Sequence, residues 1–430
     1  MKRGMKRMLV IGLAICLVSA MVFAGGSSES SATKGKRVLR VSGESWQITK
    51  LFLEDAAASF MARHPDVVVE LQTYADPMVV SNYAIDWSAG KSPVDLILID
   101  GAQFVQQFVT KDLIYDFEKD LDFFSGPVKE SDFVPSALEM SKINGVLYTI
   151  PLITEITGNN INVDMFKAAG LVDTAGNPLT PQTWEEFHEF AKKLTIKKGN
   201  EVIQQGATIQ WGKDIHGSAL GVLQAVSGKV YGADGISINF DTPEFKKVLQ
   251  IWKDGVNDGS FSVETFADYN SGRNSYKSGK VAMLVESGSR WVEAEQTLGV
   301  GKASVLPIPG SSTNGSTGYV NAVFIPRAGK EVDLAVAFIQ EELLGEHVQV
   351  NTLNKYGKLP TITKYFDMAD APDWANLKDS IAKSSTYPAY KDSSRFMDEL
   401  RTIIQSSLST DESVDTTINK LNKMISSLAK

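Results

Sequence analysis

The chain has 430 residues, of which 43 % are hydrophobic and 22 % are charged. This composition is too apolar for an intrinsically disordered chain, and the length is sufficient for two domains with substantial cores. With 43 Lys and Arg against 51 Asp and Glu, the formal net charge is −8. That balance argues against a role centred on nucleic acid, because phosphate binding needs clustered positive charge.

The N-terminal segment 1–24 has the pattern of a secretory signal peptide. Four basic residues flank the start of an apolar stretch at 8–23, and we expect cleavage after the small residue Ala24. A retained membrane anchor is the alternative, although the apolar run is at the lower limit for spanning. Cleavage removes four cations, so the mature charge becomes 39 − 51 = −12. We expect residues 25–37 to form a flexible leader, because they are rich in Gly, Ser and Lys.

The one cysteine of the chain, Cys16, lies inside this N-terminal segment. The mature chain therefore has no thiol for a disulfide, a nucleophile or a zinc site. Cys16 is also a candidate for lipid attachment, although Ile15 is bulky where a small residue normally precedes an acylated cysteine. We expect an exported protein that is periplasmic or held at the cell surface.

Strands and helices alternate along the first part of the chain. Residues 38–41 predict a strand, and apolar side chains spaced four apart over 52–60 predict a helix that ends at His64 and Pro65. A second strand is predicted at 67–71. The apolar run 95–100 is typical of a strand buried on both faces of a sheet. This alternation indicates an α/β fold.

The same alternation continues to the C-terminus. Thr183 and Glu186 form a capping box ahead of one helix, and Thr242 with Pro243 begins another. Further strands are predicted at 280–286 and 319–326, and a further helix at 333–344. Apolar residues at helical spacing over 414–428 predict an amphipathic closing helix that packs on the body of the protein.

Residues with common catalytic chemistry are sparse in this sequence. The four histidines are isolated from one another, so we expect no metal site. The sequence contains no nucleophile elbow and no phosphate-binding loop, and its Gly-rich segment 314–318 is typical of a turn, so we expect no cofactor. Because acidic residues are numerous, a carboxylate pair of the glycoside hydrolase kind remains an alternative.

The tryptophans fall into two groups. Trp184 and Trp252 lie on apolar helical faces and are expected in the core. Trp46, Trp211 and Trp291 lie among Gly, Ser and polar residues, where stacking on a ligand and partial core burial are both open. Recognition of a sugar requires an indole face for its C–H groups, with carboxylates and amides that hydrogen-bond its hydroxyls.

An ordered set of segments resembles a known family. The segments 142–151, 162–171, 181–187, 278–283, 306–309 and 358–360 resemble those of the extracellular solute-binding proteins of bacterial ABC importers, of the maltose-binding-protein type. The resemblance covers almost the whole mature chain. It implies a periplasmic-binding-protein-like α/β fold of two lobes, joined by hinge crossovers near 148–152, 306–309 and 358–360. The first lobe would contain 38–147 and 310–357, and the second 149–305 and 359–430.

The resemblance also implies where the ligand binds. Carried over position by position, it predicts contacts at strand ends and just after the crossovers. The predicted ligand-binding residues are Trp46, Asp100, Gly101, Glu155, Trp211, Trp291, Tyr319 and Asn321. For Asp100 and Glu155, a helix cap or a surface ion pair is the alternative.

The resulting hypothesis is a non-enzymatic, monomeric receptor that captures a mono- or oligosaccharide by lobe closure. It would deliver this ligand to the permease subunits of an ABC importer and would not bind nucleic acid. One alternative is a secreted carbohydrate-active hydrolase that uses acids such as Glu155 or Glu286. Another is a binding protein for a polyamine, a glycerol phosphate or a peptide. An acidic pocket would favour a cation, whereas Arg290 or Arg327 in the cleft would favour an anion.

Overall fold

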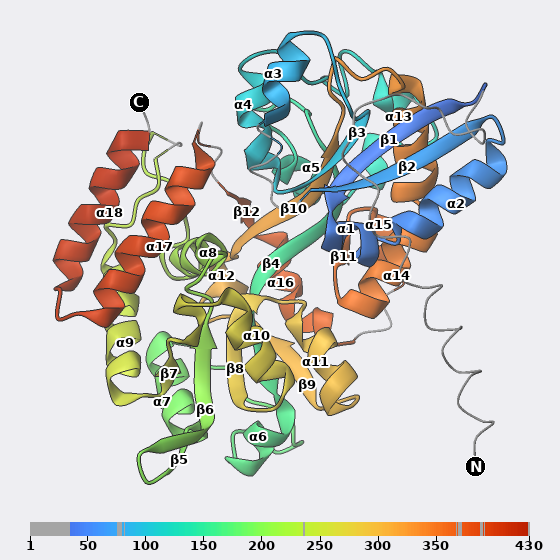
Figure 1. Ribbon diagram of the computed structural model, residues 1–430. Coiled ribbons are helices and arrows are strands. Elements are labelled where there is room, and N and C mark those ends of the chain that lie inside the picture. The colour runs from blue at the N-terminus through green and yellow to red at the C-terminus, as the bar shows by residue number, and fades with distance from the viewer. Residues whose placement is uncertain are drawn as a thin grey trace, which may run out of the picture.

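The computed structural model describes residues 35–74, 80, 82–234, 237–366, 368, 372–387, 390 and 392–428. The expected signal peptide at 1–24, with Cys16, and most of the expected leader lie outside the described residues. Figure 1 shows two lobes, one above the other, with the strands β4 and β10 running between them. Within the described ranges, no helix combines the length and the apolar character needed to cross a membrane.

The strands supply a mixed sheet that extends through both lobes. They are β1 (Arg37–Glu44), β2 (Val67–Tyr74), β3 (Leu96–Asp100), β4 (Ile150–Asn162), β5 (Ile196–Lys198), β6 (Glu201–Ile209), β7 (Phe261–Ser262), β8 (Val281–Ser287), β9 (Ala303–Leu306), β10 (Thr317–Phe324), β11 (Leu359–Pro360) and β12 (Ser385–Thr386). Neighbouring strands follow the order β2-β1-β3-β10-β4-β8-β6-β5.

Helices cover the sheet in both lobes (Figure 1). They are α1 (Ser45–Lys50), α2 (Leu53–Arg63), α3 (Tyr83–Ser88), α4 (Gln106–Val109), α5 (Pro135–Met140), α6 (Val163–Ala168), α7 (Trp184–Leu194), α8 (Ile215–Ser227), α9 (Pro243–Asp258), α10 (Tyr269–Lys277), α11 (Arg290–Leu298), α12 (Ser311–Asn314), α13 (Val332–Phe338), α14 (Glu346–Tyr356), α15 (Thr363–Phe366), α16 (Lys378–Ala382), α17 (Ser393–Ser409) and α18 (Val414–Leu428).

The strand β4 links the two lobes. Its first half pairs antiparallel with β10 and β11, and its second half pairs antiparallel with β8 and β9. Every residue of this 13-residue strand is buried. Gly158 lies near the middle of the strand, where a Cβ would come within 2.9 Å of the Val305 side chain and 3.0 Å of Gly288 Cα. The absence of a side chain at Gly158 therefore allows the strands to approach closely where the chain crosses between lobes.

The first lobe is an α/β layer around β1, β2 and β3. These strands pair in parallel, and β10 joins β3 in the antiparallel sense. The side chains of 96–99 on β3 are all fully buried, as expected for a strand covered on both faces. Burial of each such apolar side chain contributes about 1.5–3 kcal/mol.

The second lobe has its own core, built around β6 and β8. Thr183 caps α7 by accepting a hydrogen bond from the Glu186 amide at 3.2 Å, as the predicted capping box requires. Thr242 caps α9 in the same way. Trp184 and Trp252 are buried against each other with their ring centroids 5.9 Å apart, so their predicted core positions are correct.

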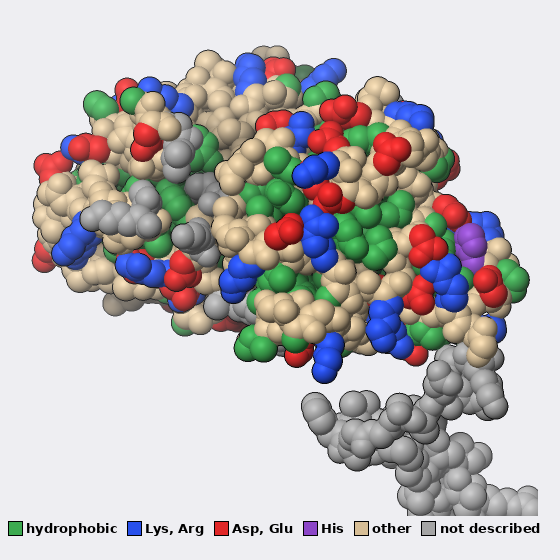
Figure 2. Space-filling model, turned by 90° about the horizontal axis from the view of Figure 1, so that it is seen from above, with side chains coloured by type: hydrophobic (Ala, Val, Ile, Leu, Met, Phe, Trp, Pro, Cys, Tyr) green, Lys and Arg blue, Asp and Glu red, His purple; other side chains and the backbone are tan. Residues whose placement is uncertain are grey.

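The closing helix α18 packs against α17 and α9, which confirms that it covers the body of the second lobe. On the face shown in Figure 2, cationic and anionic side chains are interspersed and no extended area of one sign forms. This mixed surface agrees with the balanced composition of the chain.

The lobe boundaries differ in detail from those expected. Ile362 and Tyr365 pack in the core of the first lobe, so the segment just after 358–360 belongs to that lobe. Farther along the chain, Trp374 packs in the second lobe with Trp291, so the chain has returned to that lobe by Trp374. The helix α12 packs on α8 of the second lobe, so the chain returns to the first lobe along β10 and later than 306–309. Arg37, expected in the leader, begins β1.

Candidate functional site

The candidate site lies between the lobes, at the carboxyl ends of β1 and β3. These strands end at Glu44 and Asp100, and ligands in open α/β sheets bind at such ends. The other wall comes from the second lobe, through residues just before α8 and on α10 and α11. Two adjoining hollows form the cleft, and Glu44, Asp100, Lys213, Asp214 and Tyr319 line both of them.

We call the larger hollow, of about 630 Å³, the charged chamber. Its lining includes Trp46 and Lys50 on α1, Arg273 on α10, and Lys358 just after α14. We call the smaller hollow, of about 360 Å³, the aromatic chamber. Its lining includes Tyr319 and residues of α8 and α17, and the two together fall within the size range of small-molecule sites.

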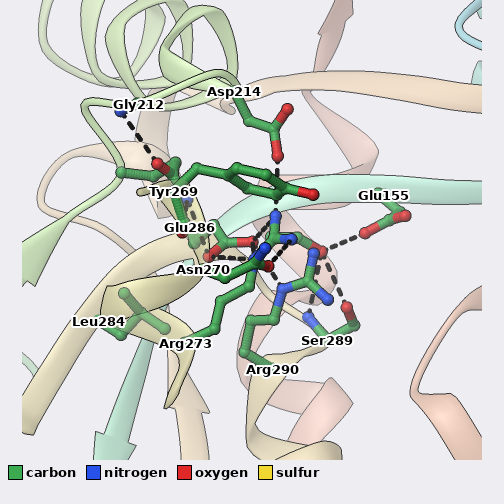
Figure 3. A network of polar contacts seen from close by, with 12 residues as sticks. Glu155, Gly212, Asp214, Tyr269, Asn270, Arg273, Leu284, Glu286, Ser289 and Arg290 are labelled. Atoms are coloured by element: carbon green, nitrogen blue, oxygen red, sulfur yellow. Dashed lines mark hydrogen bonds and ion pairs between the residues drawn. The ribbon is translucent and has the colours of Figure 1, made fainter. Parts of the chain in front are cut away.

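Two guanidinium groups that line the charged chamber flank a buried carboxylate, Glu286, which lines the aromatic chamber (Figure 3). Arg273 Nε donates to Glu286 Oε1 at 2.8 Å, and Arg290 Nε donates to the same oxygen at 2.6 Å. Burial alone would raise the pKa of Glu286, but the two arginines more than offset it and hold the pKa below its ordinary value. Glu286 is therefore ionised at neutral pH and fixes both arginines in place.

Arg273 is held on two further sides. Its NH2 group lies 2.8 Å from Asp214 Oδ2, and its guanidinium carbon lies 4.9 Å from the centre of the Tyr269 ring. Figure 3 shows the guanidinium between Asp214 and Glu286, with the Tyr269 ring beside it. A guanidinium that is paired and stacked in this way presents a rigid donor edge to the cleft.

A second buried ion pair lies where β4 meets the segment after α14. Lys358 Nζ is 2.6 Å from Glu155 Oε2, and both side chains are 3 % exposed. Ser287 donates a short hydrogen bond to the same carboxylate. Burial acts to raise the pKa of Glu155, but the charges of Lys358 and Arg290 outweigh it, and the pKa is about 2. Burial also lowers the pKa of Lys358, to about 8.

Another cation of the charged chamber, Lys50, bridges the lobes. Its Nζ lies 2.5 Å from Glu293 Oε1, which joins α1 of the first lobe to α11 of the second. Lys50, Arg273, Arg290 and Lys358 thus each have a carboxylate partner. These pairs compensate the charge of the four cations and fix many hydrogen-bonding groups around the chamber.

Asp100 differs from the other acids of the cleft. Its Oδ1 is buried and has no hydrogen-bond partner within the described part of the chain. Burial, followed by the nearby charges of Glu44 and Glu155, raises the pKa of Asp100 to about 8. This carboxyl group therefore holds its proton at neutral pH and is available to hydrogen-bond a ligand.

Four of the eight predicted site residues line the cleft. Trp46 and Glu155 line the charged chamber, and Asp100 and Tyr319 line both chambers. The Trp46 indole donates to Glu44, and Lys358 Nζ lies 5.8 Å from the centre of the Trp46 ring. Trp46 and Lys358, which are more than 250 residues apart in the sequence, therefore meet in the charged chamber.

Gly101 and Asn321 lie next to these residues and shape the strand ends. Gly101 has φ of 117°, and a Cβ there would overlap the Gln103 side chain. Asn321 is fully buried, pairs with Asp100 across β10 and β3, and accepts a 3.0 Å hydrogen bond from Gln47. Their positions support the wall of the cleft beneath Asp100.

Trp211 and Trp291 are core residues, in contrast to the prediction. Trp211 is fully buried, with its ring centroid 5.8 Å from those of Trp252 and Phe266. Trp291 is 3 % exposed and packs edge-on against Trp374 at 6.4 Å. The polar residues that flank both tryptophans in the sequence belong to turns, while the indoles themselves point into hydrophobic packing.

Several residues of the cleft were not predicted from the sequence. The sequence places Lys358 at a predicted crossover, and a lysine before Leu-Pro at a hinge is the one signal there that points to a partner for Glu155. Arg273 and Tyr387 carry no local signal, because each reaches the cleft only through the packing of its helix or loop. Among the residues that the structure describes, no group of three or more His, Cys, Asp or Glu could hold a metal ion.

Several known proteins are similar to this chain at low sequence identity. The lactose-binding protein of Rhizobium radiobacter is 22 % identical over 301 residues, which is 67 % of this chain and 66 % of the relative. An ABC substrate-binding protein of Listeria monocytogenes, solved in complex with cycloalternan, is 17 % identical with a TM-score of 0.75, over 92 % of this chain and 99 % of the other.

A second solved structure agrees with the first. A solute-binding protein of Thermotoga lettingae, bound with α-D-tagatose, is 21 % identical with a TM-score of 0.74, over 91 % of this chain and 100 % of the other. These likenesses confirm the predicted α/β fold of two lobes. The family model for bacterial extracellular solute-binding proteins matches residues 55–379, which is most of the sequence, and the chain therefore belongs to that family.

Proposed function

We propose that this protein is an extracytoplasmic receptor that captures a carbohydrate between its lobes and delivers it to the permease of an ABC importer. The observation that carries the proposal is the pairing of charges in the cleft. Lys50, Arg273, Arg290 and Lys358 are all neutralised by carboxylates, while many donors and acceptors remain fixed around an indole and a tyrosine ring. Such a surface suits an uncharged, polyhydroxylated ligand. The sugar ligands of the relatives support the same class of ligand.

Capture depends on contacts made by both lobes. Trp46 and Asp100 belong to the first lobe, and Arg273 and Arg290 belong to the second. A ligand that touches both walls stabilises the closed arrangement by its differential affinity for that state. A micromolar Kd corresponds to about 8 kcal/mol, which stacking and several charge-assisted hydrogen bonds in a closed cleft supply.

The proposal includes no catalytic step. Glu155 and Glu286 are the acids that the hydrolase alternative would use, but their pKa values lie below the ordinary range because cations adjoin both. An ionised carboxylate does not act as a general acid. Asp100 retains its proton at neutral pH, so recovery of the ligand intact is an essential part of any binding test.

Export, a monomeric state and the absence of nucleic-acid binding complete the proposal. The N-terminal segment 1–24 would direct export and be cleaved after Ala24, unless Cys16 is acylated instead. Mass spectrometry of the protein recovered from its native cell envelope distinguishes a chain that begins at Gly25 from one that begins at a lipid-modified Cys16. Either result supports export, and an uncleaved chain that remains in the cytoplasm contradicts it.

The binding experiment is a fluorescence titration of the mature chain with saccharides, spermidine, glycerol 3-phosphate and a tripeptide. We expect saturable binding of a saccharide, and Trp46→Ala should weaken it by about 1–3 kcal/mol because the indole lines the charged chamber. Tyr115→Ala is the control, since Tyr115 stacks on Arg327 and lines neither chamber of the cleft. Binding of one of the other solutes alone would contradict the carbohydrate assignment.

A further inference from the structure

The two chambers of the cleft adjoin and have different walls. Five residues line both, and Tyr319 and Asp100 lie among them at the junction. The charged chamber is walled largely by ion pairs, whereas the aromatic chamber extends against α8 and α17. A ligand of one ring would occupy one of these spaces and leave the other to solvent.

The aromatic chamber has the walls of a ring-binding site. Tyr319 and Tyr387 stack with their centroids 5.5 Å apart and their planes 20° apart. Phe104, Ile156 and Met397 supply further apolar surface. Flat aromatic and aliphatic walls of this kind pack against the C–H faces of a pyranose ring.

The same chamber contains buried polar atoms that the protein leaves unsatisfied. Ser218 is 2 % exposed, and its Oγ has no hydrogen-bond partner among the residues described. The buried Nδ1 of His216 likewise has none in the described ranges. Because burial lowers the pKa of His216, its imidazole is neutral at neutral pH and offers one donor and one acceptor. Buried polar groups are nearly always hydrogen-bonded, so these atoms indicate a bound partner with hydroxyl groups.

The charge of the aromatic chamber defines that partner further. The ionised side chains on the α17 side, Asp398 and Arg401, pair with each other at 2.8 Å. Asp214 and Glu286 also line this chamber and pair with Arg273 at 2.8 Å and 2.6 Å, and the wall includes neutral side chains such as Thr157 and Ser218. An uncharged ring with hydroxyl groups on its edge and C–H groups on its faces meets all of these requirements.

We propose that the ligand is an oligosaccharide of at least two units, with one unit in the charged chamber and the next in the aromatic chamber, between the Tyr319–Tyr387 stack and Ser218. This inference rests on the proposed carbohydrate function and specifies its size class. Tyr319 lies at the junction, so the glycosidic linkage passes beside its ring. The unit in the aromatic chamber is uncharged.

The test compares saccharides of increasing length by isothermal titration calorimetry. The probes are glucose, maltose and maltotriose, galactose and lactose, and mannose and mannotriose. We expect one oligosaccharide to bind about tenfold or more tightly than its own monosaccharide, because only the longer ligand contacts both chambers. A monosaccharide that binds as tightly as every oligosaccharide containing it would overturn the inference while leaving the proposed function intact. Absence of binding by all saccharides would overturn both.

A chamber-filling variant locates the second unit. Ser394 lines the aromatic chamber from α17, so Ser394→Trp places an indole in that space. We expect this variant to bind the oligosaccharide about tenfold more weakly and the monosaccharide within about twofold of the native protein. Ser426→Trp is the matched control, because Ser426 is exposed on α18 and lines neither chamber.

The result for Ser394→Trp is decisive in either direction when circular dichroism shows that the variant is folded. Unchanged oligosaccharide affinity would exclude the aromatic chamber from the site. If Ser394→Trp does not fold, Ser218→Ala provides the same test, since it removes the unpartnered hydroxyl and should weaken only the oligosaccharide. Equal loss for the monosaccharide and the oligosaccharide would also overturn the inference.

Discussion

Removal of the Lys358 ammonium group should destabilise the protein strongly. In Lys358→Met the aliphatic chain is retained, but Glu155 loses the cation that lies 2.6 Å from its carboxylate. Both side chains are 3 % exposed, so water cannot readily replace the lost partner. The variant therefore leaves a buried carboxylate with only Ser287 and the more distant Arg290 to stabilise its charge.

The two pKa shifts show the opposing effects that act on this pair. The pKa of Glu155 is about 2, compared with 4.5 in a model peptide, because the nearby cations outweigh the effect of burial. This shift corresponds to about 3 kcal/mol in favour of the ionised form. The pKa of Lys358 falls from 10.5 to about 8, because burial outweighs the carboxylate, which corresponds to a similar free energy against the charged lysine. The attraction between Lys358 and Glu155 contributes to both shifts, so the two are not added to give a net value for the pair. Breaking it should cost about 3–5 kcal/mol, as for other buried pairs that lose one partner.

Urea denaturation at neutral pH measures this cost for Lys358→Met, for Lys358→Met with Glu155→Gln, and for the exposed control Lys423→Met. The double variant should recover at least about 1 kcal/mol, because it removes the uncompensated charge. The control should lie within about 0.5 kcal/mol of the native protein.

The direction in which stability changes with pH provides a second check. Without Lys358 the folded-state pKa of Glu155 should rise above its unfolded value, so the remaining stability should be largest in acid and fall as the pH rises to neutrality. A loss of less than about 1 kcal/mol for Lys358→Met, with no recovery in the double variant, would refute the reasoning.

Three further predictions concern the cleft and its surroundings. Burial raises the folded-state pKa of Asp100 to about 8, so the stabilising contribution of its protonated form is full below about pH 4 and is lost as the pH rises through 8. Asp100→Asn should therefore reduce the fall of the melting temperature between pH 5 and 9. Parallel curves for the variant and the native protein would contradict this. Trp291→Ala should lower the free energy of unfolding by about 3–5 kcal/mol and leave saccharide affinity unchanged, because the indole is a core residue; weaker binding at unchanged stability would show instead that it stacks on the ligand. Gly101→Ala should cost more than about 1 kcal/mol in urea denaturation, because φ of 117° is unfavourable for any side chain, and a neutral result would contradict that cause.

Local sequence patterns predicted the helices and strands well, because neighbouring residues largely determine where each element begins and ends. The apolar run at 95–100 became β3, and the capping box at Thr183 begins α7. The helix predicted over 52–60 is α2. It ends just before His64, as predicted, because Pro65 restricts the backbone of the residue before it. In each case a few neighbouring residues determine the backbone conformation, so no knowledge of the rest of the chain is needed.

The cleft could be predicted only in part. Asp100 and Trp46 follow strand ends, where the α/β arrangement alone places ligand contacts, and both line the charged chamber. Trp211 has equally polar neighbours in the sequence, yet its indole packs on Trp252, which is 41 residues away. The direction of a side chain at the end of a strand depends on the helices packed over it, and no local pattern contains that information.

Ion pairs between distant segments were likewise beyond the sequence pattern. Glu155 and Lys358 are 203 residues apart, and Lys50 and Glu293 are 243 residues apart. With 51 acids and 43 basic residues, the number of conceivable pairs is too large for spacing to select among them. Only the fold brings these particular charges into the charged chamber.

The most direct test of the central claim is a thermal-shift screen of residues 25–430, the chain that the proposed cleavage would leave, against mono- and oligosaccharides. The sugar is recovered afterwards for mass spectrometry. A ligand that binds only the folded protein raises the melting temperature in proportion to RT ln(1 + [L]/Kd). The receptor function predicts a concentration-dependent rise with at least one saccharide, which is recovered intact. A rise only with a polyamine, a phosphate ester or a peptide, or a saccharide recovered in cleaved form, would contradict it.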